Sequence, residues 1–179
     1  GFSALDESNA IEMKRLFGSS ICYIRSSIQE KHKLSNCTIC GIIKKWLLNK
    51  KARELNADKI ATGHNLDDEA ETVLVNFFKG NIWLSLNSGP VVGMIKDKKF
   101  VTRIKPLFFC HNNETKRYVK LMGFDVIGKC PCAFGTYRLE TRAFLDSLKN
   151  SDEIKEKVVK NFLSILPNAP LECLSPFQQ

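Results

Sequence analysis

Apolar residues follow two different periods along the chain, and the two periods alternate. Helical spacing occurs over residues 6–17, 37–55, 113–122, 136–148 and 152–166, and over a further helix that begins at Asn65 or Asp67. Short apolar runs, which are typical of strands, occur at residues 21–24, 59–63, 100–106 and 124–127. Helices and strands that alternate with short connections predict an α/β protein with a doubly wound, Rossmann-like parallel sheet.

Two of these helices carry apolar stripes that should face a core. In the helix over 37–55 the stripe is Ile39, Ile42, Ile43, Trp46 and Leu47. In the helix that Asn65 or Asp67 caps, and that ends at Gly80, it is Ala70, Val73, Leu74, Phe77 and Phe78. Residues 81–99 contain Gly and Pro, which predicts a mobile loop. We expect a catalytic domain over 1–150, followed by a C-terminal helix and tail over 151–179.

Composition narrows the class of protein. The 179 residues are 44% hydrophobic and 26% charged, which is enough for a globular core and excludes low-complexity disorder. No apolar run reaches the roughly 18 residues that a membrane span needs. The net charge of +8 favours polyanionic partners, although many lysines should simply be solvated. Seven cysteines without a secretory signal indicate a reducing, cytoplasmic location, and the start at Gly1 is interpreted as a cut end.

Cysteines form one group of candidate functional residues. Cys37 and Cys40 lie three residues apart at a helix start, where they share a face and the helix dipole favours thiolate. Lys44 follows one turn later on the same side. With Cys130 and Cys132, which flank a proline, they could complete a zinc or an iron-sulfur site. Reduced interior cysteines without a metal are the simpler alternative.

An acidic turn forms a second group. Residues 61–72 join the end of a predicted strand to a helix start, the place where open α/β sheets bind ligands. Asp68, Glu71 and Thr72 occupy positions i, i+3 and i+4, so they can converge on Mg²⁺ or phosphate with His64 above them. An ordinary acidic first turn would also place Asp67 and Asp68 here, to complement the helix dipole.

Four motifs together resemble the TtuA-type tRNA 2-thiolation enzymes, which are PP-loop ATP pyrophosphatases. The motifs are Cys-x-x-Cys-Gly with a later Leu-Asn over 37–49, the segment 61–74, Arg-Ile-Lys-Pro-Leu over 103–107, and Cys130-Pro131. The resemblance extends over about residues 36–148. It implies an adenine nucleotide alpha hydrolase-like fold and an enzyme that adenylates the C2 oxygen of a tRNA uridine with ATP, then replaces that oxygen with sulfur.

The resemblance also assigns roles to residues and implies partners. Cys37, Cys40 and Cys130 would hold a 4Fe-4S cluster with one open iron, with Cys37 and Cys130 acting in catalysis. Asp68 would be catalytic and Lys44 would stabilise charge. The residues expected to bind ATP and Mg²⁺ are Gly63, His64, Asp67, Asp68 and Thr72. Those expected to contact tRNA are Lys45, Lys51, Arg53, Arg103 and Lys105. A ubiquitin-like sulfur carrier and a homodimer are implied as well.

Three departures from the family pattern leave alternatives open. The Ser-Gly-Gly-x-Asp-Ser phosphate loop occurs nowhere in the chain, which predicts an N-terminally incomplete domain that binds ATP poorly and is inactive by itself. Cys132 stands where relatives are expected to have Tyr, and paired-cysteine zinc modules are missing. The main alternative is a non-catalytic tRNA-binding subunit with structural zinc. A third possibility, an ATP-dependent amide or lysidine ligase, has no use for the cysteines.

Overall fold

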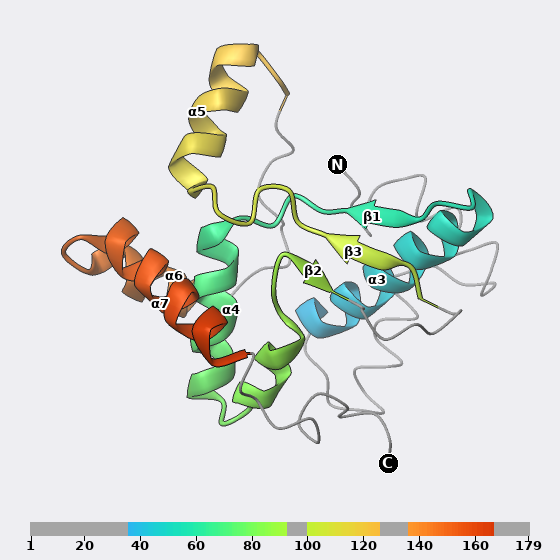
Figure 1. Cartoon of the computed structure of the whole chain (residues 1–179). Helices are drawn as coiled ribbons and strands as arrows, with labels where there is room; N and C mark the ends of the chain where they lie inside the picture. Colours follow the sequence, from blue (N-terminus) through green and yellow to red (C-terminus); the bar gives the residue numbers. More distant parts are fainter. Residues whose placement is uncertain (1–35, 93–99, 126–135, 167–179) are drawn as a thin grey trace. The chain divides into compact units, whose positions relative to one another are not determined.

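The computed structural model describes residues 36–92, 100–125 and 136–166 (Figure 1). Of these, residues 36–57 belong to one compact unit and the others to a second unit, and each unit is described by itself. The predicted helix over 6–17, the strand over 21–24 and the Cys130-Pro131-Cys132 turn lie outside the described residues.

The first unit contributes helix α3, Asn36–Glu54, which confirms the helix predicted over 37–55. Ile39, Ile43 and Leu47 are buried along it. Ile42 and Trp46, which were expected in the same stripe, are 56% and 43% exposed, so that part of the prediction is wrong. The buried residues are four positions apart and form one narrow row, and Ile42 and Trp46 lie beside that row.

A three-stranded sheet lies in the second unit, with strand order β1-β3-β2. Strand β1, Lys59–Ala61, pairs in parallel with β3, Thr102–Ile104, which confirms the α/β crossover. Strand β2, Val91–Val92, pairs antiparallel with β3 and makes the sheet mixed. The segment over 81–99, which was expected to be a mobile loop, therefore contains β2 and also a 3₁₀ helix, η1, Ile82–Asn87.

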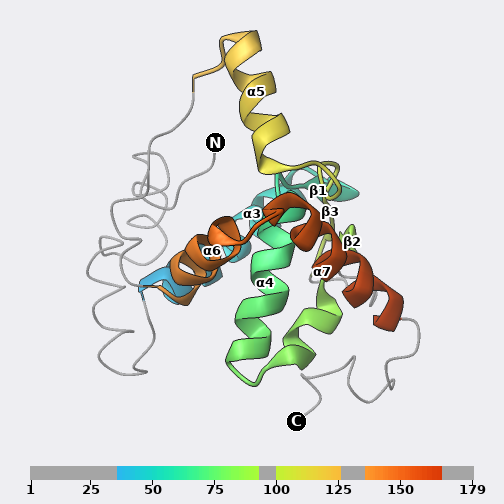
Figure 2. The same cartoon turned by 90° about the vertical axis from the view of Figure 1, so that its left-hand side faces the viewer.

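Helix α4, Leu66–Phe78, lies at the centre of the second unit. It packs against α6, Tyr137–Ser147, and α7, Ser151–Ile165, as Figure 2 shows, and also contacts η1. The core comprises Leu66, Ala70, Phe108, Leu145 and Val159. Because this core surrounds the first turns of α4, its last turn extends beyond it: Phe77 and Phe78 are 65% and 51% exposed, against the prediction that they are core residues.

The remaining helix, α5, spans Asn112–Met122 and ends at Gly123, whose φ of 65° suits a left-handed helix cap. Helix α5 buries none of its residues. Helix α7 shares a core with α4 and α6, and a domain boundary at residue 150 stays a prediction. None of the helices in the described ranges has an apolar stretch long enough to cross a bilayer.

Candidate functional site

The candidate site forms where β1 ends and α4 begins. The side chain of Asn65 caps α4 by accepting a hydrogen bond from the Asp68 backbone N–H at 3.1 Å. Asp68 Oδ2 in turn accepts from the Asn65 backbone N–H at 3.3 Å, which completes a capping box. This reciprocal pair fixes Asp68 beside the carboxyl end of β1, the sheet edge at which α/β proteins bind ligands.

A polar pocket of about 340 Å³ opens at this junction, lined by Gly63, His64, Asp68 and Arg138. His64 Nδ1 lies 3.1 Å from Thr62 Oγ1. Burial lowers the pKa of His64, and the nearby Asp68 carboxylate only partly opposes that shift, so the imidazole is neutral at pH 7. Three of the four lining residues belong to the acidic turn that the sequence singled out.

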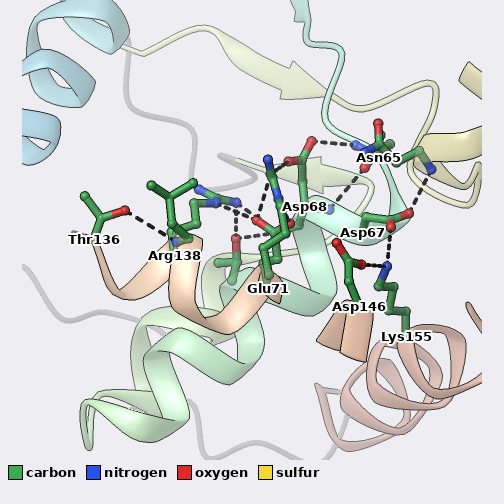
Figure 3. A network of polar contacts seen from close by, with 12 residues as sticks. Asn65, Asp67, Asp68, Glu71, Thr136, Arg138, Asp146 and Lys155 are labelled. Atoms are coloured by element: carbon green, nitrogen blue, oxygen red, sulfur yellow. Dashed lines mark hydrogen bonds and ion pairs between the residues drawn. The ribbon is translucent and has the colours of Figure 1, made fainter. Parts of the chain in front are cut away.

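Arg138 is the lining residue that sequence reasoning missed. It comes from the first turn of α6, and its guanidinium points at the first turns of α4 (Figure 3). Arg138 Nη2 donates to the Asp68 carbonyl at 3.0 Å and to Thr72 Oγ1 at 2.9 Å. The available signal was a pair of arginines, Arg138 and Arg142, at i and i+4 on one predicted helix, matching the acids of another.

Glu71 is turned toward α6 and away from the pocket. Its side chain is only 2% exposed and accepts from Arg138 Nε at 3.0 Å and from Arg142 Nε and Nη2. The hydrogen bonds to Glu71 raise the pKa of Arg142. Glu71 therefore pairs with two guanidinium groups, and the expected convergence of Asp68, Glu71 and Thr72 on one ion stays a prediction that these contacts do not support.

Asp67 contacts α7 and the start of α5. Its carboxylate accepts from Lys155 Nζ and from the Asn112 backbone N–H, both at 2.8 Å, and Lys155 also bonds Asp146 at 2.6 Å (Figure 3). Burial by itself would raise the pKa of Asp67, but the hydrogen bonds from Lys155 and Asn112 outweigh it and lower the pKa. Asp67 does not line the pocket, so its assignment to ATP or Mg²⁺ stays a prediction that the pocket does not support.

The other residues expected at the site have separate surroundings. Thr72 Oγ1 donates to the Asp68 carbonyl at 2.7 Å. Lys105 is largely buried and pairs with Glu69 at 2.7 Å, while Arg103 is half-buried on β3. On α3 in the other unit, the three basic residues expected to contact tRNA are exposed: Lys45, Lys51 and Arg53.

The candidate metal ligands are only partly described. Positions 37 and 40 both lie in the first turns of α3, three residues apart, which suits two thiolates on one helix face. Cys40 is half-buried, and Lys44 lies one turn further on. Cys130 lies outside the described ranges, and within those ranges no three His, Cys, Asp or Glu residues group in a way that could hold a metal ion.

Fold and pocket together define an α/β protein with a polar ligand site at a strand-to-helix junction. No family model matches the sequence. The chain is 31% identical over 159 residues to the tRNA-5-methyluridine(54) 2-sulfurtransferase of Pyrococcus horikoshii, covering 83% of this chain and 50% of that relative. It is 33% identical over 129 residues to the tRNA 2-thiolation protein NcsA of Haloferax volcanii, covering 69% and 40%.

A solved structure gives the same indication. The U34-tRNA thiolase NcsA from Methanococcus maripaludis with its [4Fe-4S] cluster matches with a TM-score of 0.67 and 31% identity, covering 78% of this chain and 47% of that chain. The resemblance that the motifs indicate is therefore confirmed: the chain is related in sequence and in fold to the tRNA 2-thiolation proteins. It spans half or less of the length of these relatives.

Proposed function

We propose that the protein containing this chain is an ATP-dependent tRNA sulfurtransferase that converts a uridine to 2-thiouridine. The observation that carries the proposal is the pocket at the start of α4, because it presents Asp68 from the motif that resembles the thiolation enzymes. The named relatives support the same activity. ATP would adenylate the C2 oxygen of the base, pyrophosphate would leave, and sulfur would then displace the activated oxygen together with AMP.

Within this proposal the pocket binds the nucleotide. Asp68 keeps a carboxylate oxygen at the pocket wall, since its side chain is 27% exposed, and it can hold Mg²⁺ or handle a proton. His64 is neutral and can accept or donate a hydrogen bond. Thr72 acts indirectly, because its hydroxyl is already engaged by the Asp68 carbonyl and by Arg138.

The sulfur chemistry would use Cys37, Cys40 and Cys130 as ligands of a 4Fe-4S cluster, with zinc as the alternative metal. When bound, such a cluster supplies an open iron site at which sulfur can attach. Two of the three thiols share the first turns of α3, where the positive end of the helix dipole favours thiolate. Lys44, four residues after Cys40, would stabilise negative charge that develops near the sulfur.

Transfer RNA would be bound mainly through the exposed basic residues of α3: Lys45, Lys51 and Arg53. These side chains neutralise phosphates without reading sequence. Arg103 and Lys105 are weaker candidates, because Arg103 is half-buried and Lys105 pairs with Glu69. A ubiquitin-like sulfur carrier, a homodimer and a cytoplasmic location complete the proposal. The location is supported by a relative, the cytoplasmic tRNA 2-thiolation protein 1 of Aedes aegypti. It is 33% identical over 151 residues, covering 83% of this chain and 42% of that relative.

The proposal is tested with the full-length protein prepared anaerobically. Iron and acid-labile sulfide are quantified, and tRNA is incubated with ATP and a sulfide source, then digested and analysed for 2-thiouridine by mass spectrometry. Cys37→Ser should remove the iron and the thiolation, and Asp68→Asn should remove thiolation while iron is retained. Matched controls are Cys110→Ser and Asp58→Asn, which should preserve both. Colourless protein with stoichiometric zinc and no ATP-dependent thiolation would instead support the tRNA-binding subunit.

A further inference from the structure

Arg138 uses only part of its guanidinium within the protein. Its Nε and Nη2 groups bond to Glu71, Thr72 and the Asp68 carbonyl, all on α4. The Nη1 group has no hydrogen-bond acceptor from the described residues, although an arginine offers five N–H donors. The side chain is 46% exposed and lines the pocket, so this remaining end of the fork is accessible to a ligand.

The orientation of Arg138 is set before any ligand binds. Glu71 is buried at 2% exposure and accepts the Nε hydrogen bond of Arg138 at 3.0 Å, so it holds that side of the guanidinium in place. Thr72 Oγ1 and a backbone carbonyl fix the plane of the same group. A ligand that meets a side chain already held in place loses little rotamer freedom on binding, and binding is correspondingly tighter.

Gly63 gives the pocket a stretch of wall without a side chain. A Cβ added at Gly63 would meet no atom within 4 Å, so packing does not require glycine there. Its φ lies outside the left-handed range, so the backbone conformation does not require glycine either. A position with no side chain at the wall of a polar pocket lets a ligand approach the main chain.

We propose that Arg138 is the residue that recognises phosphate in this pocket, binding a phosphate group of the adenine nucleotide through the end of its guanidinium. Arginine suits this task because it stays charged and offers five N–H donors: three are used to hold Arg138 on α4, and the two on Nη1 remain for phosphate oxygens. Arg138 is also the one cation among the four lining residues, since His64 is neutral at pH 7. The inference rests on the proposed function for the identity of the nucleotide.

The carboxylate of Asp68 lies in the same pocket and repels a bare phosphate. The geometry therefore favours a phosphate that arrives with Mg²⁺, which Asp68 can hold while Arg138 binds the phosphate oxygens. Glu71 is a positioning residue in this arrangement, because it touches Arg138 and not the pocket. In this arrangement Asp68 would bind the metal ion, whereas Glu71 would hold Arg138 in place.

The experiment measures the dissociation constants of MgATP, AMP and adenosine for the full-length protein by calorimetry. Arg138→Lys keeps the charge but loses the Nη1 donors that the bonds to α4 hold in place, and it should weaken MgATP and AMP by about 10- to 100-fold while adenosine is unchanged. Arg142→Lys is the comparison variant, because Arg142 is similarly exposed, lies one turn later and bonds the same Glu71 without lining the pocket. Arg142 Nη2 also lies 3.7 Å from Asp68 Oδ1, and lysine keeps a positive charge near that carboxylate. Arg142→Lys should change nucleotide binding less than about threefold.

Two outcomes would overturn the inference. Equal losses in Arg138→Lys and Arg142→Lys would mean that both arginines serve only to hold Glu71. A loss of tRNA affinity with unchanged MgATP affinity would transfer the role to RNA phosphate. Nucleotide binding that depends on Arg138 in a protein without thiolation activity would refute the proposed function and leave the inference intact.

A second measurement on unmodified protein covers the case in which a variant does not fold. Phenylglyoxal labels accessible arginines, and peptide mass spectrometry reports each site separately. MgATP should protect Arg138 and leave Arg142 reactive, whereas adenosine should protect neither. Equal labelling of Arg138 with and without saturating MgATP contradicts the inference.

Discussion

Asp67 and Asp68 are consecutive residues with the same chemistry, yet α4 gives them different surroundings. Successive helical positions are about 100° apart, so one carboxylate faces α7 and the other faces the pocket. Asp67 is bound to Lys155, whose side chain is 6% exposed, while Asp68 stays accessible at the pocket wall. The contrast teaches that a run of acids in a functional motif can contain a residue that holds the fold together.

The strongest test of this contrast removes the cation beside Asp67. Lys155→Met should lower the free energy of unfolding by about 3 to 5 kcal/mol, because it leaves a buried carboxylate without its partner. Urea denaturation measures the change. Lys157→Met is the control on the same helix: its pair with Glu153 is exposed, so its loss should be below about 0.5 kcal/mol. Equal losses in the two variants would remove the structural role assigned to Asp67.

A direct comparison neutralises each carboxylate in turn. Asp67→Asn should lower stability by about 2 to 3 kcal/mol, since Lys155 then loses a charged partner in a buried site. Asp68→Asn should lower it by less than about 1 kcal/mol, because an asparagine oxygen can still accept the capping hydrogen bond. Thermal unfolding and the thiolation assay are measured on both. The distinction fails if Asp68→Asn destabilises the fold as much as Asp67→Asn does.

The pH dependence of stability tests the contribution of Asp67. The pKa of Asp67 is lower in the folded protein, so its contribution to stability is fully present above about pH 4 and is lost as the pH falls through the folded value. In Asp67→Asn the stability should therefore fall less steeply as the pH is lowered than in the unmodified protein. Unfolding free energies measured between pH 2 and about 6 test this. The same decrease in unfolding free energy at low pH in both proteins would contradict this prediction.

The smallest effect concerns the cap that fixes both residues. Asn65 is 7% exposed, and its side chain satisfies the Asp68 backbone N–H. Asn65→Ala should cost about 1 kcal/mol of stability, whereas Asn65→Asp keeps an acceptor and should cost less. Differential scanning calorimetry can resolve the two variants. A stability in Asn65→Ala equal to that of the unmodified protein would show that the start of α4 does not depend on its cap.

The sequence predicted those parts of the site that local chemistry controls. The strand at residue 59 and a cap at Asn65 follow from neighbouring residues, and so does the pocket wall at Gly63, His64 and Asp68. The spacing of Arg138 and Arg142 indicated two arginines on one helix face, but it did not indicate their partners, because the contact of Arg138 with α4 joins positions 70 residues apart. The different roles of Asp67 and Asp68 depend on Lys155, which lies 88 residues from Asp67 in the sequence.

Two errors in the fold have related causes. Helical periodicity showed which side of α4 is apolar but not how far its neighbours extend, and so Phe77 and Phe78 were placed in the core. Strand β2 is two residues long and follows Gly89 and Pro90, too short for a recognisable alternation. Its pairing is made by β3, which lies ten residues further along the chain.

Glu71 accepts hydrogen bonds from two arginines of α6 at once, and this has a kinetic consequence. Neither helix can separate from the other without breaking both contacts in a single step, so local opening of the pair is cooperative. Amide deuterium uptake in the middle of α4 and in the first turns of α6 should accordingly proceed at one shared rate. In Glu71→Gln the two segments should instead take up deuterium at two different rates.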